Sequence, residues 1–270
     1  MSEAHETVVA VAQFAPTNDL ATNVAEIRSL AGDAVARGAT LVVFPEYSSY
    51  FLPNLGQELV DAAEPLDGAF VGELAAVASD LGIHVVAGMA EKIDEPDRFA
   101  NTVVAVDPGG ALVATYRKLQ LYDAFGATES EWVRAGDVEA PQTFTFGDFT
   151  VGLQTCYDLR FPEVTRRLVD AGATLVLVPS EWATGPLKEE HWRILIAARA
   201  LENTIYVAAA DHTPPVGVGH SMIVDPMGVT VASGGEVRGV SAAAISRSRV
   251  ADVRLVNPAL TLRRFAVVPR

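Results

Sequence analysis

Short runs of apolar residues alternate along this chain with longer, Ala-rich segments in which apolar residues recur every three or four positions. Apolar runs of this length are typical of buried strands, and the longer spacing is typical of amphipathic helices. Between Val24 and Ala34, for example, the apolar residues follow the helical spacing, so one face of this segment should pack on a sheet. The alternation predicts an α/β protein.

The pattern sets approximate boundaries for these elements. The expected strands are Val8–Phe14, Thr40–Phe44, His84–Gly88, Thr102–Val106, Leu112–Thr115, Thr150–Gln154, Thr174–Val178, Ile205–Ala209 and Ser221–Val224. The expected helices are Leu20–Arg37, Ala69–Leu81, Phe161–Ala171 and His191–Asn203. No low-complexity run or Pro/Ser-rich linker separates them.

The second half of the chain repeats motifs of the first half in the same order. The stretch "GATLVVFPE" from Gly38 recurs as "GATLVLVPSE" from Gly172, and each follows a strand containing Gln and an Ala-rich helix. Later, "VDPGG" from Val106 has its counterpart in "VDPMG" from Val224, where Asp-Pro-x-Gly is typical of a turn between hairpin strands. We therefore expect two similar halves, packed sheet to sheet. Neither half could bury its sheet alone, so residues 1–270 should form one domain.

Composition and charge narrow the class of protein. The chain has 270 residues, 50% of them hydrophobic, which is ample for a large core. A net charge of −14 makes nucleic acid and anionic membranes unfavourable partners. The N-terminus lacks the pattern of a secretory signal, and no segment is apolar for long enough to cross a bilayer, so we expect a cytoplasmic protein.

Three residues with chemical potential follow expected strands. Glu46 comes after the strand Thr40–Phe44, Lys118 after Leu112–Thr115, and Cys156, the only cysteine, after Thr150–Gln154. Strand ends are common places for sites. Each residue alone also has an ordinary interpretation, as a turn cap, a surface charge or a buried thiol. Their combination and order are what suggest a site.

The motifs around these residues resemble those of a known superfamily. They are "FPEY" from Phe44, "YRK" from Tyr116 and "CYDLRFPE" from Cys156, and in this order they resemble the nitrilase or carbon–nitrogen hydrolase superfamily. Three further stretches, "WATGPLKEEHW", "ARALENTIYVAAA" and "GHSMIVDPMG", are most similar to Nit-type amidases that act on short ω-amides or on deaminated glutathione. The resemblance implies a four-layer α-β-β-α sandwich, a homodimer, a small-molecule amide substrate and no cofactor.

The resemblance also implies how the residues act. An amide carbonyl is a poor electrophile, so hydrolysis needs a thiolate, a stabilised oxyanion and a protonated leaving group. Cys156 would be the nucleophile and Glu46 the general base, while Lys118 and the backbone N–H of Tyr157 would stabilise the oxyanion. Ammonia would leave when the thioester intermediate forms, and water would then hydrolyse this thioester. The helix expected over Phe161–Ala171 would favour anionic sulfur if its N-terminus came close.

A second glutamate is expected in the loop "DAFGATESEWVRAGD" from Asp123. Relatives place it shortly before a Gly-Asp pair, which Glu129 matches better than Glu131. It would hold Lys118 and the substrate amide in position. Gln120 stands where many Nit-type relatives carry His, a difference that bears on the substrate more than on the reaction.

Candidate substrate-binding residues are Arg160, Glu181 and Trp182. Because the chain is acidic overall, an anionic substrate would need nearby cations, for which Lys118, Arg160 or Arg193 are available. Arg160 could instead form a structural ion pair with Asp158. The pocket walls are expected in four loops: Ser48–Gly56, Asp123–Trp132, Ser180–Glu189 and Asp211–His220.

Other functions are consistent with parts of the sequence. The same triad could serve a nitrilase or an N-carbamoyl amide hydrolase. A thiol redox protein would use Cys156 but lacks a resolving cysteine, and a non-catalytic binding protein would not need every catalytic position filled. The five histidines show no zinc-site spacing, so we expect no metal, and nothing recommends one of them over Glu46 as a partner of the thiol.

Overall fold

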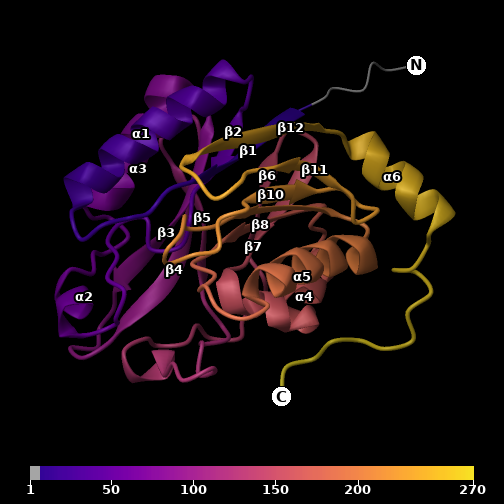
Figure 1. Ribbon diagram of the computed structural model, residues 1–270. Coiled ribbons are helices and arrows are strands. Elements are labelled where there is room, and N and C mark those ends of the chain that lie inside the picture. Colours follow the sequence, from indigo (N-terminus) through magenta and orange to yellow (C-terminus); the bar gives the residue numbers. More distant parts are fainter. Residues whose placement is uncertain (1–6) are drawn as a thin grey trace.

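The computed structural model describes residues 7–270, and its main feature is a pair of six-stranded sheets packed face to face, with helices covering both outer faces (Figure 1). The strand order is β12-β1-β2-β3-β4-β5 in the first sheet and β11-β10-β9-β8-β7-β6 in the second. This confirms the expected α-β-β-α sandwich of two similar halves.

The element boundaries lie close to those expected. The strands are β1 (Thr7–Gln13), β2 (Leu41–Val43), β3 (His84–Lys92), β4 (Phe99–Val106), β5 (Leu112–Arg117), β6 (Thr143–Phe146), β7 (Phe149–Leu153), β8 (Leu175–Pro179), β9 (Tyr206–Ala210), β10 (Met222–Val224), β11 (Thr230–Ser233) and β12 (Gly239–Ile245). The helices are α1 (Leu20–Ala36), α2 (Gln57–Asp61), α3 (Ala69–Leu81), α4 (Pro162–Asp170), α5 (Lys188–Asn203) and α6 (Arg247–Val256), with 3₁₀ helices η1 (Glu129–Glu131) and η2 (Cys156–Arg160).

The repeated sequence motifs take equivalent places in the two halves. Strands β1, β2 and β3 run parallel at the centre of one sheet, as do β7, β8 and β9 in the other. The two Asp-Pro-x-Gly motifs join the antiparallel pairs β4–β5 and β10–β11. In each turn the Asp accepts hydrogen bonds from the backbone N–H groups two and four residues later, Asp107 in one and Asp225 in the other. The predicted hairpins are confirmed.

The core lies in three layers. The central layer packs apolar side chains of both sheets against each other, and the outer layers pack each sheet against its helices. Along β1, Val9 and Val11 point into the central layer, whereas Ala10 and Ala12 point toward α1 and α3. This alternation is the two-residue period of a strand buried on both faces. No helix among residues 7–270 has the length and apolar character needed to span a membrane.

Several elements were missed by sequence reasoning. Strand β12 follows the second half of the chain but pairs antiparallel with β1 of the first sheet. Its residues are small and mostly half-buried, so they lack the apolar run of a central strand. Strands β6 and β11, helix α2 and helix α6 are short or largely polar, which leaves little periodic signal.

Candidate active site

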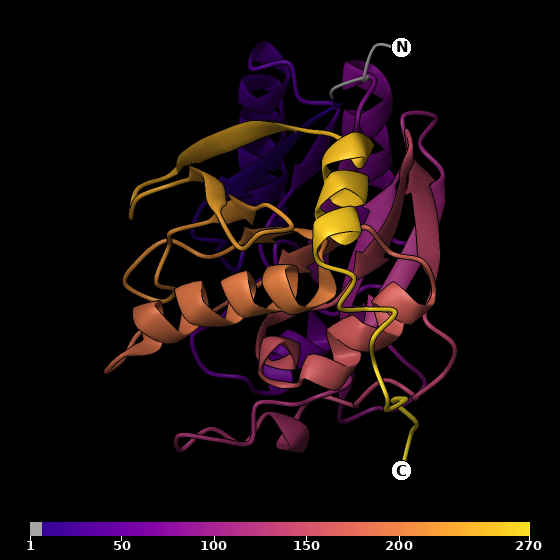
Figure 2. The ribbon, with the colours of Figure 1, turned by 90° about the vertical axis from the view of Figure 1, so that its right-hand side faces the viewer.

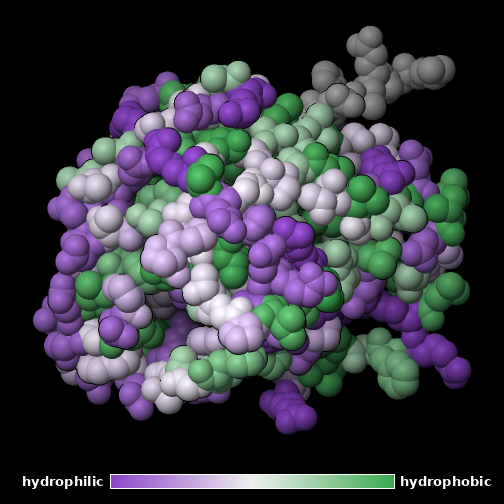
Figure 3. Space-filling model, viewed as in Figure 1, coloured by the Kyte–Doolittle hydropathy of each residue, from purple (hydrophilic) through white to green (hydrophobic). Residues whose placement is uncertain are grey.

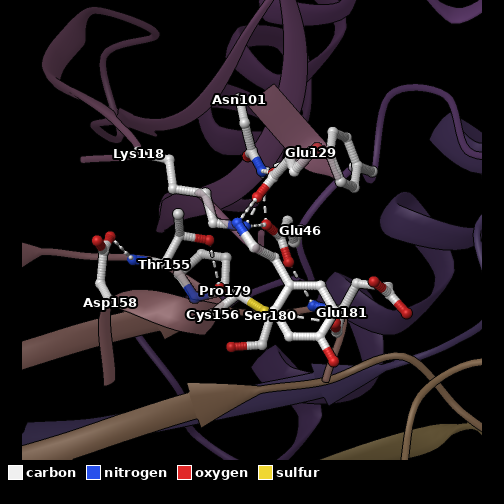
Figure 4. A network of polar contacts seen from close by, with 12 residues as sticks. Glu46, Asn101, Lys118, Glu129, Thr155, Cys156, Asp158, Pro179, Ser180 and Glu181 are labelled. Carbon is white, nitrogen blue, oxygen red and sulfur yellow. Dashed lines mark hydrogen bonds and ion pairs between the residues drawn. The ribbon is translucent and has the colours of Figure 1, made fainter. Parts of the chain in front are cut away.

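The three residues singled out by their motifs converge on one cavity of about 430 Å³. Glu46 follows β2, Lys118 follows β5, and Cys156 follows β7, so both sheets contribute to the cavity floor. Figure 4 shows their side chains directed toward one another. All three are almost completely buried, with 1%, 2% and 7% of their surfaces exposed.

Lys118 lies between two glutamates. Its Nζ is 3.0 Å from Oε1 of Glu46 and 3.0 Å from Oε1 of Glu129 (Figure 4). Burial lowers the pKa of Lys118, but the carboxylates of Glu129 and Glu46 more than offset this, so the pKa is raised well above its usual value. Lys118 therefore carries a fixed positive charge. The structure places Glu129 against the lysine, while Glu131 is exposed at the cavity rim.

Asn101, which sequence reasoning missed, joins the two glutamates. Its Nδ2 lies 2.6 Å from Glu46 Oε1, 3.1 Å from Glu129 Oε1 and 2.9 Å from the Tyr47 hydroxyl. The only signal in the sequence was a polar amide within the buried strand "FANTVVAV" of β4. A buried amide within a hydrogen-bonded strand has little freedom to move, so it fixes both carboxylates relative to Lys118.

Cys156 begins the η2 turn with a positive φ of 46°, a conformation uncommon for residues other than Gly. Its Sγ donates to the backbone carbonyl of Glu181 at 3.3 Å. Burial, and then the negative charge of Glu46, raise the pKa of the thiol well above its usual value, with Lys118 acting in the opposite direction. The helix expected to favour anionic sulfur, α4, begins at Pro162, and the η2 turn lies between it and Cys156.

Asp158 holds the turn that carries the cysteine. Its Oδ2 accepts from the Tyr116 hydroxyl at 2.7 Å and from the Thr155 N–H at 3.2 Å. Its Oδ1 accepts from the backbone N–H of Gln120 at 3.0 Å. Asp158 therefore ties the cysteine turn to the segment around Lys118. The alternative ion pair between Asp158 and Arg160 is not formed. The Asp158 carboxylate instead accepts hydrogen bonds from the hydroxyl and the two backbone N–H groups named above.

The backbone of Glu181 contacts both the base and the thiol. Its N–H donates to Glu46 Oε2 at 2.6 Å, and its carbonyl accepts from Cys156 Sγ. Its carboxyl lines the cavity, where burial, and then the charge of Glu46, raise the pKa of Glu181 to about 8. The next residue, Trp182, also lines the cavity, and its backbone N–H donates to Asp211 Oδ1 at 2.6 Å.

Three of the four expected loops contribute to the walls of the cavity: Ser48–Gly56, Asp123–Trp132 and Ser180–Glu189. The expectation for Asp211–His220 is wrong, since none of its residues lines the cavity. This loop instead supports the site from behind: His212 Nε2 lies 2.6 Å from the Glu46 carbonyl. Burial lowers the pKa of His212 to about 4, so this imidazole is neutral and donates to that carbonyl.

The structure also shows where Arg193 and the histidines lie relative to the cavity. Arg193 does not line the cavity, because it is half exposed on α5 and pairs with Glu189 at 2.8 Å. Among residues 7–270, no histidine makes a hydrogen bond to the Cys156 thiol. His5 lies outside the described residues. Among the described residues, the thiol donates to the Glu181 carbonyl, and Glu46 lines the same cavity.

Comparisons with known proteins show what this chain is similar to. The family described as "Carbon-nitrogen hydrolase" matches residues 8–255. A protein named deaminated glutathione amidase from Escherichia coli O157:H7 is 39% identical over 265 residues, which cover 96% of this chain and 98% of that protein.

Solved structures show the same fold. The C. elegans NitFhit protein superposes with a TM-score of 0.89 at 31% identity, over 98% of this chain and 66% of that one. A mutant of the amidase from Nesterenkonia sp. AN1 superposes with a TM-score of 0.78 at 28% identity, over 97% and 98% of the two chains. That structure shows the acetamide moiety of fluoroacetamide added covalently at the active-site cysteine.

Proposed function

Because this chain belongs to the carbon-nitrogen hydrolase family, we propose that Cys156, Glu46 and Lys118 hydrolyse the primary amide of a small carboxylate-bearing ω-amide. The chain is an amidase that acts on C–N bonds other than peptide bonds. The observation that carries the assignment of residues is a lysine buried between two glutamates beside the only thiol, at the floor of one cavity.

The first half of the reaction forms a thioester. The Cys156 sulfur attacks the amide carbon while Glu46 takes the thiol proton. The electron pair of the C=O bond moves to oxygen, and the resulting oxyanion is stabilised by Lys118 Nζ and by the backbone N–H of Tyr157. This N–H is suited to the role because the first N–H groups of a helical turn have no partner within the turn. The C–N bond then breaks, and Glu46 gives its proton to the departing ammonia.

The second half returns the enzyme to its starting state. A water molecule attacks the thioester carbon while Glu46 takes one of its protons. The same oxyanion contacts stabilise the second tetrahedral intermediate. When the C–S bond breaks, the sulfur regains its proton from Glu46, and the free acid leaves. Atoms and charges therefore balance without a cofactor.

The surroundings of Glu46 and Cys156 fit these steps. The raised pKa of Cys156 keeps the thiol protonated at neutral pH, so the reaction needs a base close by. The Glu46 carboxylate is held at Oε1 by Lys118 and at Oε2 by the N–H of Glu181. A base held in this way loses little entropy when the substrate arrives. Glu129 holds Lys118 and is not required to transfer a proton.

Arg160 is the group that we assign to the substrate carboxylate. Its guanidinium lines the cavity and lies 4.9 Å from the centre of a Trp182 ring. Within residues 7–270 it forms no ion pair, and its buried Nε has no hydrogen-bond partner. Arg160 is half-buried, and a guanidinium in such a place without a carboxylate favours an anionic ligand, because leaving it unpaired is costly. Deaminated glutathione, named in the relatives, is one such compound to test; nitriles and N-carbamoyl compounds are the alternatives.

We expect an ω-amido acid to be hydrolysed at least about 100-fold more efficiently than its methyl ester, because the ester leaves Arg160 unpaired. The measurement is kcat/KM by ammonia release, which counts only amide cleavage. Deaminated glutathione releases an amine in place of ammonia, so its acid product is followed instead. Equal kcat/KM values for the acid and the ester would contradict recognition of a substrate carboxylate. Faster turnover of an aliphatic nitrile would instead identify the protein as a nitrilase.

We also propose that the protein is a homodimer formed through α6 and the C-terminal segment. Val250 and Val253 of α6 pack within the chain itself, but Leu255 and Val256 are 83% and 76% exposed. Leu262, Phe265 and Val268 are exposed as well. Figure 2 shows this segment running along one side of the molecule, and Figure 3 shows hydrophobic residues at the same edge. Such a patch on a monomer is typical of an interaction surface.

Sedimentation at micromolar concentration should therefore give a dimer, and Leu255→Asp should shift the protein toward a monomer. The matched control is Val237→Asp, since Val237 is 77% exposed but lies outside this segment. A wild-type monomer would contradict the proposal, as would equal effects of the two variants.

The chemistry also favours a location in which thiols stay reduced. Cys156 is a free thiol, and oxidation would remove the nucleophile. Reducing conditions are those of the cytoplasm, and with a net charge of −14 the chain is not suited to nucleic acid or anionic lipid. We therefore propose a cytoplasmic enzyme whose partners are its small-molecule substrate and its own copy.

A further inference from the structure

Besides Lys118 and Arg160, the cavity holds a third cation that has no part in the proposed function. Lys188, the first residue of α5, lines the cavity and is only 7% exposed. Its Nζ donates to the Tyr122 hydroxyl at 2.5 Å and lies 4.0 Å from the centre of the Phe125 ring. The same ring lies 5.3 Å from the guanidinium carbon of Arg160. One phenyl ring therefore contacts both cations.

No carboxylate described in the structure neutralises these two charges. Lys188 forms no ion pair among residues 7–270, and neither does Arg160. Burial, and then the positive charge of Arg160, lower the pKa of Lys188, as expected for two cations that face the same space. This part of the cavity is therefore positively charged.

The acidic groups of the cavity are engaged elsewhere or uncharged. Glu46 and Glu129 are paired with Lys118. Glu131 is exposed at the rim. Glu181, with a pKa of about 8, is mostly protonated at neutral pH. The two aromatic rings nearest to Lys188, Tyr122 and Phe125, already contact its ammonium group.

We propose that Lys188 is a specificity-determining residue that excludes substrates carrying an ammonium group beside the carboxylate. The proposal rests on the function proposed above, in which Arg160 receives that carboxylate. An acyl chain with a carboxylate alone is attracted by both cations. An α-amino acid amide brings the same carboxylate together with an ammonium group, which Lys188 repels and which finds no ionised carboxylate free to bind it. The site thus selects ω-amides that lack an α-amino group.

The test compares two amides of equal length, glutaramate and glutamine, which differ only by the α-ammonium group. Two like charges about 6 Å apart in a partly buried site repel each other enough for a preference of roughly 100-fold. We expect wild-type kcat/KM to favour glutaramate by this factor, and Lys188→Met to reduce the preference about tenfold or more. Lys188→Arg should keep it, because the charge remains.

A matched control is available on the same helix. Arg193→Met removes a cation of α5 that is half exposed and paired with Glu189, outside the cavity, so the preference should not change. Glu181→Gln tests the competing explanation. If this variant made the preference for glutaramate larger, Glu181 would be receiving the ammonium group, and the proposal would be overturned.

A binding measurement separates this inference from the proposed reaction. Calorimetry with the Cys156→Ala variant should show tighter binding of glutarate than of glutamate, and the difference should shrink when Lys188→Met is added. If wild type hydrolyses both amides and Lys188→Met leaves the ratio unchanged, the inference is wrong and the reaction stands. If neither amide is hydrolysed but binding depends on Lys188 as described, the reaction is wrong for this substrate class and the selectivity stands. If neither amide is hydrolysed and binding does not depend on Lys188, both the proposed reaction and the proposed selectivity are wrong.

Discussion

Cys156→Ala should lower amide hydrolysis by about 10⁴-fold or more, to the uncatalysed rate, because the covalent route then has no nucleophile. Glu46 and Lys118 remain in place in this variant, but no thioester can form without the Cys156 sulfur. The measurement is ammonia or acid release from an ω-amide at saturating concentration. Mass spectrometry of wild type mixed with the same amide should show a transient acyl adduct on Cys156, and the variant should show none.

The same variant should remain folded. The thiol is 7% exposed and makes one hydrogen bond, to the carbonyl of Glu181, so its loss should change the free energy of unfolding by about 1 kcal/mol or less. Unfolding by denaturant checks this. Turnover above the uncatalysed rate in the folded variant would refute the cysteine mechanism. An oxygen adduct after peroxide, without any acyl adduct from amides, would instead favour a redox thiol.

Lys118→Arg should fail although it keeps the positive charge, with a loss in kcat/KM of about 100- to 1000-fold. Lys118 is 2% exposed, and its Nζ lies 3.0 Å from a carboxylate oxygen of each of two glutamates. A planar guanidinium is larger and must displace Glu46 or Glu129, and it directs its N–H groups differently toward the oxyanion. We therefore expect kcat/KM to fall because the guanidinium has a different shape, although the charge of the side chain is unchanged.

The control for this variant is Lys92→Arg. Lys92 ends β3 and is exposed, so the same exchange there should change neither activity nor stability noticeably. The variant at Lys118 should also be less stable, because adding volume to a packed site costs about 1 to 3 kcal/mol. A rate near that of wild type would show that Lys118 does not contact the reacting atoms.

The fold was predictable where the pattern was strong. Central strands such as β8 are continuous apolar runs, because both of their faces are buried, and α1 and α3 show the helical period of one buried face. Edge strands and short helices carry no such signal. Strand β12 is the clearest case, since its small residues gave no indication that it returns to pair with β1.

The local motifs of the chain indicated hydrolysis of a C–N bond and predicted which residues perform it. The order and local motifs of Glu46, Lys118 and Cys156 are visible along the chain, because each lies next to a strand end whose apolar run can be recognised. The internal repeat likewise indicated two sheets with a shared core. The motifs are local, and the repeated motifs follow the same order in both halves. Both can therefore be recognised without knowing which segments meet in space.

The groups that surround these residues could be identified only from the folded chain. Asn101, His212 and Lys188 come from segments far apart in the chain, and although the loops that hold His212 and Lys188 were expected near the cavity, the sequence did not show which groups these three side chains contact. Burial and pairing also depend on the fold: the same residue type is an exposed ion pair at Arg193 and an unpaired cation of the cavity at Arg160. The physical reason is that desolvation and Coulomb interactions depend on distance in space, which the separation of two residues in the sequence does not give.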